Sequence, residues 1–222
     1  MTKKLKIILI VVVFILIAGG LLVWKTWNWQ GKMGDLRSYV TSLFSGEKVE
    51  ELPADVKAAY EALKNDPSNT SAYIKIAAWK RDQGQLADAI KLYESALEVK
   101  PDDTLLLMNS AELYTRNEQY AEAAGAYVKV MESNPKWLAA YRSLADLYRY
   151  QMPERKIEIP SILKRGLEAN SENEIYFVAP LAIYYKDFGP EDEAIRWYER
   201  LLELEPGNLT AQKELEELKN KQ

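Results

Sequence analysis

The chain has 222 residues, of which 48% are hydrophobic, and a formal net charge of −4. This length and apolar content are enough for one or two folded domains with a core. There is no Cys and no His, which excludes disulfides, thiolate nucleophiles, the usual zinc ligands and the usual general base near neutral pH. No loop has the carboxylate spacing of a Mg²⁺ or Ca²⁺ site. We therefore expect no catalytic residues, no metal and no cofactor.

Charge is distributed unevenly along the chain. Residues 1–46 hold six of the 29 Lys and Arg residues but only one of the 33 acidic residues, Asp35. The rest of the chain therefore carries 23 basic residues against 32 acidic ones. Phosphate binding needs a basic face, so this acidic part argues against a nucleic-acid partner.

The first predicted element is a transmembrane helix at residues 7–24. The run IILIVVVFILIAGGLLVW contains no charged residue. As a helix its 18 residues span about 27 Å, close to the ~30 Å hydrocarbon thickness of a bilayer. Three basic residues precede the run: Lys3, Lys4 and Lys6. Three tryptophans, whose indole rings favour the headgroup layer, lie at its far end: Trp24, Trp27 and Trp29. These features predict a single membrane anchor.

A cleaved signal peptide is the alternative for this segment. Ala18, Gly19 and Gly20 resemble a small-residue cleavage site, but the apolar run continues beyond them and the Trp cluster suits an anchored helix. The basic residues before the run lie closer to it than those behind it. This bias predicts that residues 1–6 form a cytoplasmic tail and that the bulk of the chain lies on the other side of the membrane.

A juxtamembrane segment, residues 25–53, follows the anchor. Within it, residues 35–44 place apolar side chains at i, i+3, i+4, i+7 and i+8, which predicts a short amphipathic helix with Asp35 as its N-cap. This helix either lies on the bilayer or docks a partner, or it packs on the first folded unit. Residues 47–53 form a short charged linker.

Beyond residue 53 the sequence repeats with a period of 34 residues. Small residues, tyrosines and prolines recur at this step: Ala77, Ala111 and Ala145; Ala89 and Ala123; Tyr93 and Tyr127; Pro67, Pro101 and Pro135. A fixed period of this length indicates a stack of similar supersecondary units that bury their cores against one another. Such a stack is a surface for holding other proteins.

These positions resemble the tetratricopeptide repeat family, whose helix-turn-helix has two small packing residues, two aromatic ones and a proline near its end. Four units match over about residues 70–206. The packing positions are Ala77, Ala89, Tyr93, Ala111, Tyr114, Ala123, Tyr127, Ala145, Tyr148, Ala182, Tyr185, Ala194 and Tyr198. Gly84 and Gly189 fall at turns, where glycine tolerates a positive φ, and proline stops each second helix.

The third unit departs from this pattern. Ala145 and Ala182 are 37 residues apart, and residues 151–160 (QMPERKIEIP) replace the compact turn. We expect a loop insertion there, which either has no role or protrudes to contact a partner. A second helix is predicted over residues 161–168, with Ile162, Leu163 and Leu167 facing inward.

The resemblance implies an all-α fold, in which the transmembrane helix is followed by a right-handed α-solenoid of about four tetratricopeptide units with capping helices. The expected repeat domain comprises residues 54–222, with repeats at about 70–103, 104–137, 138–174 and 175–208. A helix over residues 54–66 would cover the first unit. A charged helix over residues 209–220 would cap the last, as terminal repeats require.

In this family the first helix of each unit lines a concave face that binds peptides. The candidate groove residues at these positions are Arg81, Met108, Glu112, Arg116, Arg142, Arg149, Tyr150, Tyr176 and Lys186. Thr115 and Asp146 are among the other residues expected on the same face. Each unit places a cation near the end of its first helix, and a row of such cations would suit an acidic or extended peptide. Alternatively, these cations serve the helix dipole and are neutralised by neighbouring Asp residues. Met108 either forms an apolar floor in the groove or packs against the preceding helix.

The layout is similar to that of bacterial inner-membrane tetratricopeptide proteins with a signal anchor. The implied function is a single-pass scaffold for protein–protein interaction that recruits or assembles an envelope complex, with the repeat domain outside the cytoplasm. Its partners would be proteins or peptides in the groove and the bilayer around the anchor. A cytoplasm-facing docking or import receptor of the same fold is the alternative. An enzyme is not expected, because there is no His and no Gly-rich phosphate loop.

Overall fold

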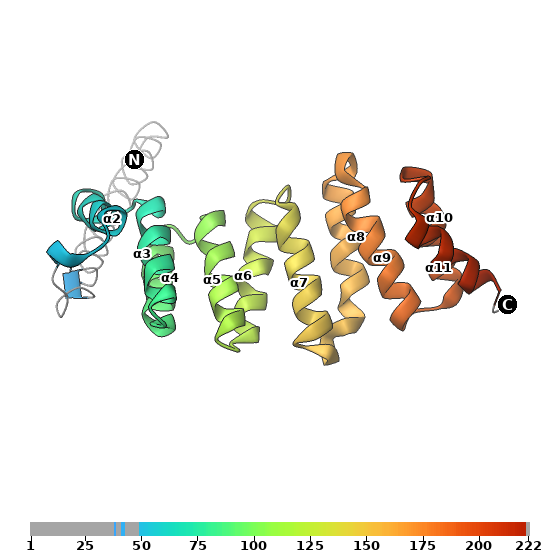
Figure 1. Cartoon of the computed structure of the whole chain (residues 1–222), viewed down its shortest axis with the longest axis horizontal. Coiled ribbons are helices and arrows are strands. Elements are labelled where there is room, and N and C mark those ends of the chain that lie inside the picture. Colours follow the sequence, from blue (N-terminus) through green and yellow to red (C-terminus); the bar gives the residue numbers. More distant parts are fainter. Residues whose placement is uncertain (1–37, 39–40, 43–48, 221–222) are drawn as a thin grey trace, which may run out of the picture. The chain divides into compact units, whose positions relative to one another are not determined.

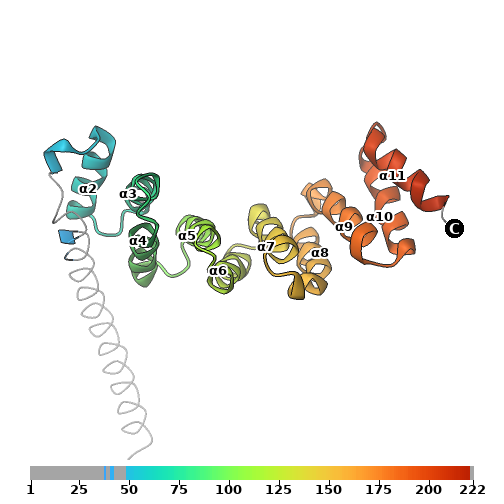
Figure 2. The same cartoon turned by 60° about the horizontal axis from the view of Figure 1, so that its bottom comes forward.

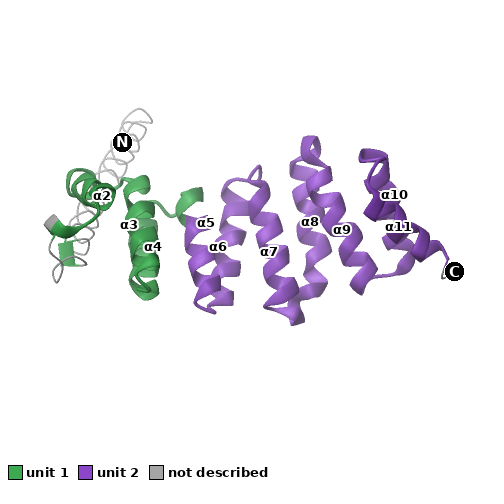
Figure 3. Cartoon of the chain, in the orientation of Figure 1, with its two compact units in different colours: residues 1–106 green, residues 107–222 purple. Residues whose placement is uncertain are grey.

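The computed structural model describes residues 38, 41–42 and 49–220, and all its regular elements in these ranges are helical (Figures 1 and 2). The chain divides into two compact units, residues 1–106 and 107–222 (Figure 3). The predicted transmembrane helix lies outside the described residues, and so does most of the predicted helix at residues 35–44. Within the described ranges, no helix combines the length and the apolar character that crossing a bilayer requires.

Unit 1 contains a short 3-10 helix and three α-helices, followed by the start of a fourth. These are η1 (Val49–Glu51), α2 (Ala54–Asn65), α3 (Thr70–Asp82), α4 (Leu86–Val99) and the first residues of α5 (Thr104–Arg116). Helix α3 packs against both α2 and α4. The core of unit 1 contains the small and aromatic residues of the repeat pattern, among them Tyr73, Ala77, Ala89 and Tyr93, all of which are buried.

Unit 2 continues the succession of helices. After the rest of α5 come α6 (Tyr120–Ser133), α7 (Leu138–Tyr150), η2 (Pro153–Glu158), α8 (Ile159–Ala169), η3 (Ser171–Asn173), α9 (Ile175–Phe188), α10 (Glu191–Leu204) and α11 (Leu209–Lys219). From α6 onward each α-helix packs against the next. The small packing residues Ala111, Ala123, Ala145, Ala182 and Ala194 are all buried, which allows the helices to approach closely.

Short polar residues set the start of several first helices. The Asn69 side-chain oxygen accepts a hydrogen bond from the Ala72 amide at 3.1 Å, and Asp103, 34 residues later, accepts one from Leu106 at 3.1 Å. Asn208 caps α11 in the same way. Side-chain acceptors at this position satisfy amides that have no partner within the helix, so the repeat register also fixes where these helices begin.

The carbonyl of the proline before a repeat accepts a hydrogen bond from a tyrosine in the first helix of that repeat. The Tyr73 hydroxyl donates to the Pro67 carbonyl at 3.0 Å, and the Tyr141 hydroxyl donates to the Pro135 carbonyl at 3.2 Å. Both tyrosines are buried, and burial raises the pKa of each above its ordinary value. Each phenol therefore stays a neutral donor that ties a turn to a helix.

The turn glycines differ in backbone conformation. Gly84 has φ 77°, in the left-handed region predicted for the turn, and Glu118, 34 residues later, adopts φ 60° at the same repeat position. The expectation of a positive φ at Gly189 is wrong, because its φ is −109°. A Cβ at Gly189 would collide with the Tyr185 ring, so glycine is needed there for close approach to that ring.

The insertion in the third repeat is an ordered 3-10 helix, η2, rather than a loop. It packs against α7 and α8. The Arg155 guanidinium lies 4.2 Å from the centre of the Tyr148 ring and donates two hydrogen bonds of 2.8 Å to the Glu158 carboxylate. A cation held over an aromatic face and by a bidentate carboxylate gives this segment a defined conformation.

Helix α8 begins two residues earlier than predicted, at Ile159. Its residues Ile159, Leu163 and Gly166 are buried and repeat the i, i+4, i+7 spacing of the buried α10 residues Ala194, Tyr198 and Leu201. Leu167, predicted to face inward, is only half-buried.

After α8, Asn170 takes part in holding the turn. Its side chain is 1% exposed and donates to the carbonyls of Pro135 and Gly166, both at 3.0 Å.

Candidate functional site

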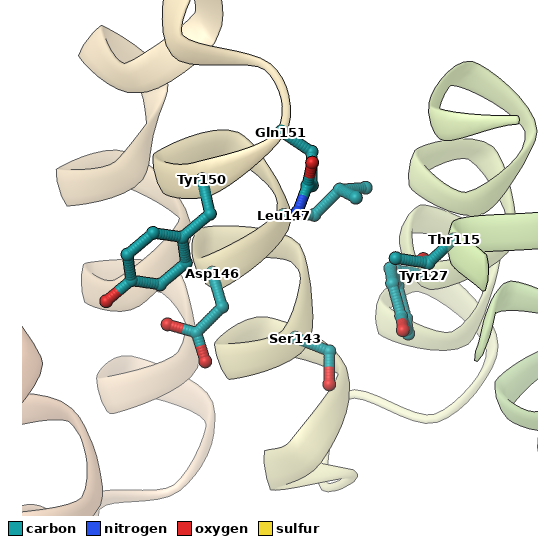
Figure 4. A pocket seen from close by; sticks show the side chains of 7 residues that line it. All are labelled: Thr115, Tyr127, Ser143, Asp146, Leu147, Tyr150 and Gln151. Carbon is teal, nitrogen blue, oxygen red and sulfur yellow. The ribbon is translucent and has the colours of Figure 1, made fainter. Parts of the chain in front are cut away.

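Two neighbouring hollows lie between α5, α6 and α7 in unit 2. One has a volume of about 270 Å³ and is lined by Thr115, Tyr127, Ser143, Asp146, Leu147, Tyr150 and Gln151 (Figure 4). The other has a volume of about 320 Å³ and is lined by Met108, Asn109, Glu112, Tyr127 and Ser143. They share Tyr127 and Ser143 and are therefore adjacent, and together they are called the α5–α7 groove.

The repeat register brings these side chains together. Asn109 and Ser143 are 34 residues apart, as are Glu112 and Asp146, so each pair occupies equivalent positions on α5 and α7. Along α7, Asp146 and Tyr150 are spaced i, i+4 and therefore share a face of the helix. Consecutive first helices thus present the same kind of polar side chain to one groove.

The floor of the groove is polar. Tyr127, from α6, is buried and lines both hollows together with Ser143. Burial is the main cause of the raised pKa of Tyr127, so its hydroxyl is neutral across the physiological range. The Thr115 hydroxyl donates to the Ala111 carbonyl at 2.8 Å, which orients the Thr115 side chain.

The wall formed by α7 is more exposed and carries both a charge and an aromatic ring. Tyr150 is 68% exposed although it is a large aromatic residue, and in Figure 4 its ring and the Asp146 carboxylate point to the same side of α7. Desolvation raises the pKa of Asp146, although the neighbouring Arg142 and Arg149 lower it. This wall can accept a cation or a hydrogen-bond donor.

The cations predicted to form a row each have a carboxylate partner. In unit 1, Arg81 pairs with Asp82 at 2.9 Å. In unit 2 the pairs are Arg116 with Glu112 at 2.9 Å, Arg149 with Asp187, and Lys186 with Glu214 of α11 at 2.9 Å. The hydrogen bond from Lys186 to Glu214 raises the pKa of that lysine. None of these four cations lines either hollow.

Of the predicted groove residues, Met108, Glu112 and Tyr150 line the groove. Arg116, Arg142 and Arg149 lie beside it through contacts with lining residues. Three others are elsewhere: Arg81 belongs to unit 1, Lys186 is bound to α11, and Tyr176 lies under the Arg142 guanidinium, 5.6 Å from it.

Several lining residues were absent from the predicted set. They are Asn109, Ser143, Leu147 and Gln151, together with Tyr127, which was assigned only a packing role. Thr115 and Asp146, which were expected on the concave face, also line the groove. The signal for Ser143 was present in the sequence as the 34-residue step from Asn109. Tyr127 gave no such signal, because a buried packing tyrosine and a groove floor have the same pattern. Among the described residues, no group of acidic side chains is placed to hold a metal ion.

Comparison with known proteins supports the repeat assignment. Residues 80–147 match the family model for the tetratricopeptide repeat. Tetratricopeptide repeat protein 28 of Mus musculus is 38% identical over 58 residues, which is 26% of this chain and 2% of that protein. ER membrane protein complex subunit 2 of Xenopus tropicalis is 29% identical over 112 residues, which is 50% of this chain and 38% of that protein. The chain therefore matches well under two thirds of the length of either relative.

Solved structures share the fold at low identity. MamA superposes with a TM-score of 0.54 and 23% identity, over 67% of this chain and 80% of MamA. YrrB, described as a TPR protein with an unusual peptide-binding site, superposes with a TM-score of 0.55 and 21% identity, over 73% of this chain and 82% of YrrB. A tetratricopeptide repeat protein from Parabacteroides merdae superposes with a TM-score of 0.55 and 22% identity, over 85% of this chain and 72% of that protein. The chain thus carries tetratricopeptide repeats at residues 80–147 within an all-α fold that it shares with these solved structures.

Proposed function

We propose that this chain is a membrane-anchored scaffold whose α5–α7 groove binds an extended segment of a partner protein. The observation that carries the proposal is the groove itself. It consists of two adjacent hollows across three helices, with Met108 lining one and the exposed Tyr150 lining the other, and with Tyr127 and Ser143 lining both. An apolar contact at each end of a polar floor suits a segment laid along the groove.

The chemistry of the lining suits a peptide backbone. Hydroxyls from Thr115, Tyr127 and Ser143 and amides from Asn109 and Gln151 line the two hollows. Such groups can both donate to and accept from main-chain amides and carbonyls. The groove has no histidine and no cysteine, since the chain has neither. A binding role is therefore better supported than a catalytic one.

The location proposed for the scaffold follows from the sequence. The uncharged run at residues 7–24, with Lys before it and Trp at its end, supports an anchor in a bacterial inner membrane. The basic bias of the N-terminal flank supports a cytoplasmic N-terminus and a repeat domain on the outer side, where it would recruit or assemble an envelope complex. The same fold facing the cytoplasm as a docking receptor is the second candidate, favoured by the basic residues Lys25, Lys32 and Arg37 behind the run.

Two measurements test the anchor and its orientation. The full chain should sediment with membranes after carbonate extraction, and a chain without residues 1–30 should be released. Alkaline phosphatase fused to the C-terminus, which is active only outside the cytoplasm, should be active. Release of the full chain by carbonate would contradict the anchor, and an inactive fusion that is stably produced would favour the docking-receptor alternative.

Site-specific photocrosslinking tests the groove. A photoreactive amino acid replaces Met108 or Tyr150 in the full chain, and in a control it replaces Lys129, which is exposed on α6 and does not line the groove. The two groove positions should yield adducts with the same protein in native membranes, and the control position should not. Adducts of equal yield at all three positions, or none at Met108 and Tyr150, would rule out the groove as the binding site.

A further inference from the structure

The charges that line the α5–α7 groove are of one sign. The residues around both hollows include two carboxylates, Glu112 and Asp146, and no Lys or Arg. The other lining groups are hydroxyls, amides and the apolar side chains of Met108 and Leu147. A ligand in this groove therefore meets negative charge from both α5 and α7.

The cations beside the groove are held away from its lining or can be displaced. Arg149 pairs with Asp187 and lies over the Phe188 ring at 5.3 Å. Arg116 pairs with Glu112 at 2.9 Å, with both side chains about half exposed, and the Arg142 Nε lies 4.0 Å from the Asp146 carboxylate. Exposed ion pairs of this kind contribute little net stability, so an incoming cation can replace either arginine.

Asp146 and Tyr150 together form a place for such a cation. They are one helical turn apart on α7, both line the same hollow, and their side chains point to the same side of the helix (Figure 4). Arg149 lies 5.7 Å from the Tyr150 ring, but with 68% of Tyr150 exposed the ring has room for a second cation. A carboxylate beside an aromatic face is the arrangement that binds a guanidinium or ammonium group.

The Asp146 carboxylate is partly desolvated but still accessible. Desolvation by the neighbouring protein raises the pKa of its carboxyl, which means that its charged form has lost part of its hydration. The Asp146 side chain is still 56% exposed, so a cationic side chain can reach its carboxylate.

We infer that the groove takes an extended peptide segment bearing a Lys or Arg side chain, seated between the Asp146 carboxylate and the Tyr150 ring. A second basic residue of the segment would face Glu112. This inference rests on the proposed function, because it assumes that the groove binds a peptide. It differs from the acidic peptide suggested by the row of cations, since none of those four cations lines either hollow, whereas two carboxylates do.

A random-peptide library displayed on phage and selected on the full chain in detergent micelles tests the inference. Peptides enriched by the wild-type chain should be rich in Arg and Lys and poor in Asp and Glu. Replacing the key Arg of an enriched peptide with Gln should weaken its binding, measured by fluorescence anisotropy, by about three- to fivefold.

Variants of the chain locate the effect. Asp146→Asn and Tyr150→Leu should each weaken the same peptide by about three- to fivefold, whereas Tyr150→Phe should bind like the wild type because the ring is kept. Glu132→Gln is the matched control, because Glu132 is exposed on α6 outside the groove and its replacement changes the net charge equally. Circular dichroism checks that each variant is as helical as the wild type.

The outcomes separate the inference from the proposed function. Enriched peptides without basic residues, or binding that Asp146→Asn and Glu132→Gln weaken equally, would overturn the inference and leave the groove as a peptide site. If the wild-type chain enriches no peptide, peptide binding by the groove is overturned as well, and the inference with it.

Discussion

At the scale of single residues, Gly84 and Glu118 occupy the same position in the turns of the first and second repeats and adopt the same left-handed backbone conformation. Gly84 and Glu118 are 34 residues apart and both lie in the left-handed region, with φ 77° and 60°. Glycine adopts this conformation without steric strain, whereas a residue with a Cβ does not. The repeat geometry therefore imposes a conformation on Glu118 that its own side chain disfavours.

Glu118→Gly should raise the free energy of unfolding by about 1 kcal/mol, because it removes the strain of the left-handed conformation. Urea denaturation followed by circular dichroism on the full chain in detergent measures the change. Gln119→Gly is the control, since Gln119 has φ −87° and glycine there should cost about 0.5–1 kcal/mol. Equal losses of stability in both variants would show that the strain at Glu118 is not relieved.

Gly166 and Gly125 form a second pair of comparable positions, both within helices of unit 2. A Cβ at Gly166 would collide with the Phe177 ring and come within 2.9 Å of Tyr141 Cγ, whereas a Cβ at Gly125 would meet nothing within 4 Å. The two rings are fully buried and pack edge to face with their centres 5.9 Å apart. There is little space into which they could move.

Gly166→Ala should therefore lower the free energy of unfolding by about 1–3 kcal/mol through overpacking. Gly125→Ala should raise it by about 0.5–1 kcal/mol, because alanine favours the helix and meets no neighbour. The same denaturation measurement gives both signs. A stabilised Gly166→Ala variant would mean that Phe177 and Tyr141 can rearrange at little cost.

At the scale of elements, the insertion between α7 and α8 shows how an added segment becomes ordered. Residues 153–158 form η2, and the contact between Arg155 and the Tyr148 ring joins it to α7. Glu158 orients the guanidinium through its two hydrogen bonds, and these bonds raise the pKa of Arg155. A single side chain thus supplies much of the attachment of this segment.

Arg155→Ala should loosen η2 without unfolding α7 or α8. We expect amide hydrogen exchange across residues 153–158 to speed up by about fivefold, as expected from the loss of about 1 kcal/mol of cation–π contact. Lys129→Ala, an exposed change on α6, should leave exchange in this segment unaltered. Unchanged protection of residues 153–158 in Arg155→Ala would indicate that backbone packing alone holds η2.

At the scale of the whole molecule, the ionised Asp146 carboxylate in the groove does not favour folding. The pKa of Asp146 is raised in the folded state above its ordinary value of 3.8, chiefly by desolvation. For an acid with a raised folded pKa, the contribution to stability is fully present below the ordinary pKa and is lost as pH rises through the folded pKa. At neutral pH the ionised Asp146 therefore opposes folding slightly.

Asp146→Asn should leave the stability of the chain at neutral pH unchanged or raise it by less than about 0.5 kcal/mol, since the group is partly exposed and solvent screens it. Relative to the wild type, any advantage should disappear as the pH falls below the ordinary Asp pKa of 3.8, because the carboxyl is then protonated in both the folded and the unfolded chain. Thermal denaturation across this pH range measures the difference, with Glu132→Gln as the control. A clear loss of stability at neutral pH would show that the ion pair with Arg142 outweighs desolvation.

The periodic features of this protein can be predicted from its sequence. The 34-residue step of Ala, Tyr and Pro places the packing residues and the start of each helix, because burial on one helical face depends only on spacing along the chain. The same step places Asn109 with Ser143 and Glu112 with Asp146. The membrane anchor stays a prediction of the sequence, as residues 7–24 lie outside the described part.

The pairing of charges and the conformation of the irregular segments depend on the three-dimensional packing. Lys186 pairs with Glu214, 28 positions away, and Arg149 with Asp187, 38 positions away, and neither partner follows from local spacing. Residues 153–158 became helical through contacts with α7 and α8, although two prolines and no regular pattern suggested a loop. Long side chains choose among several partners that folding brings near, and that choice depends on distances in space, which a one-dimensional period does not contain.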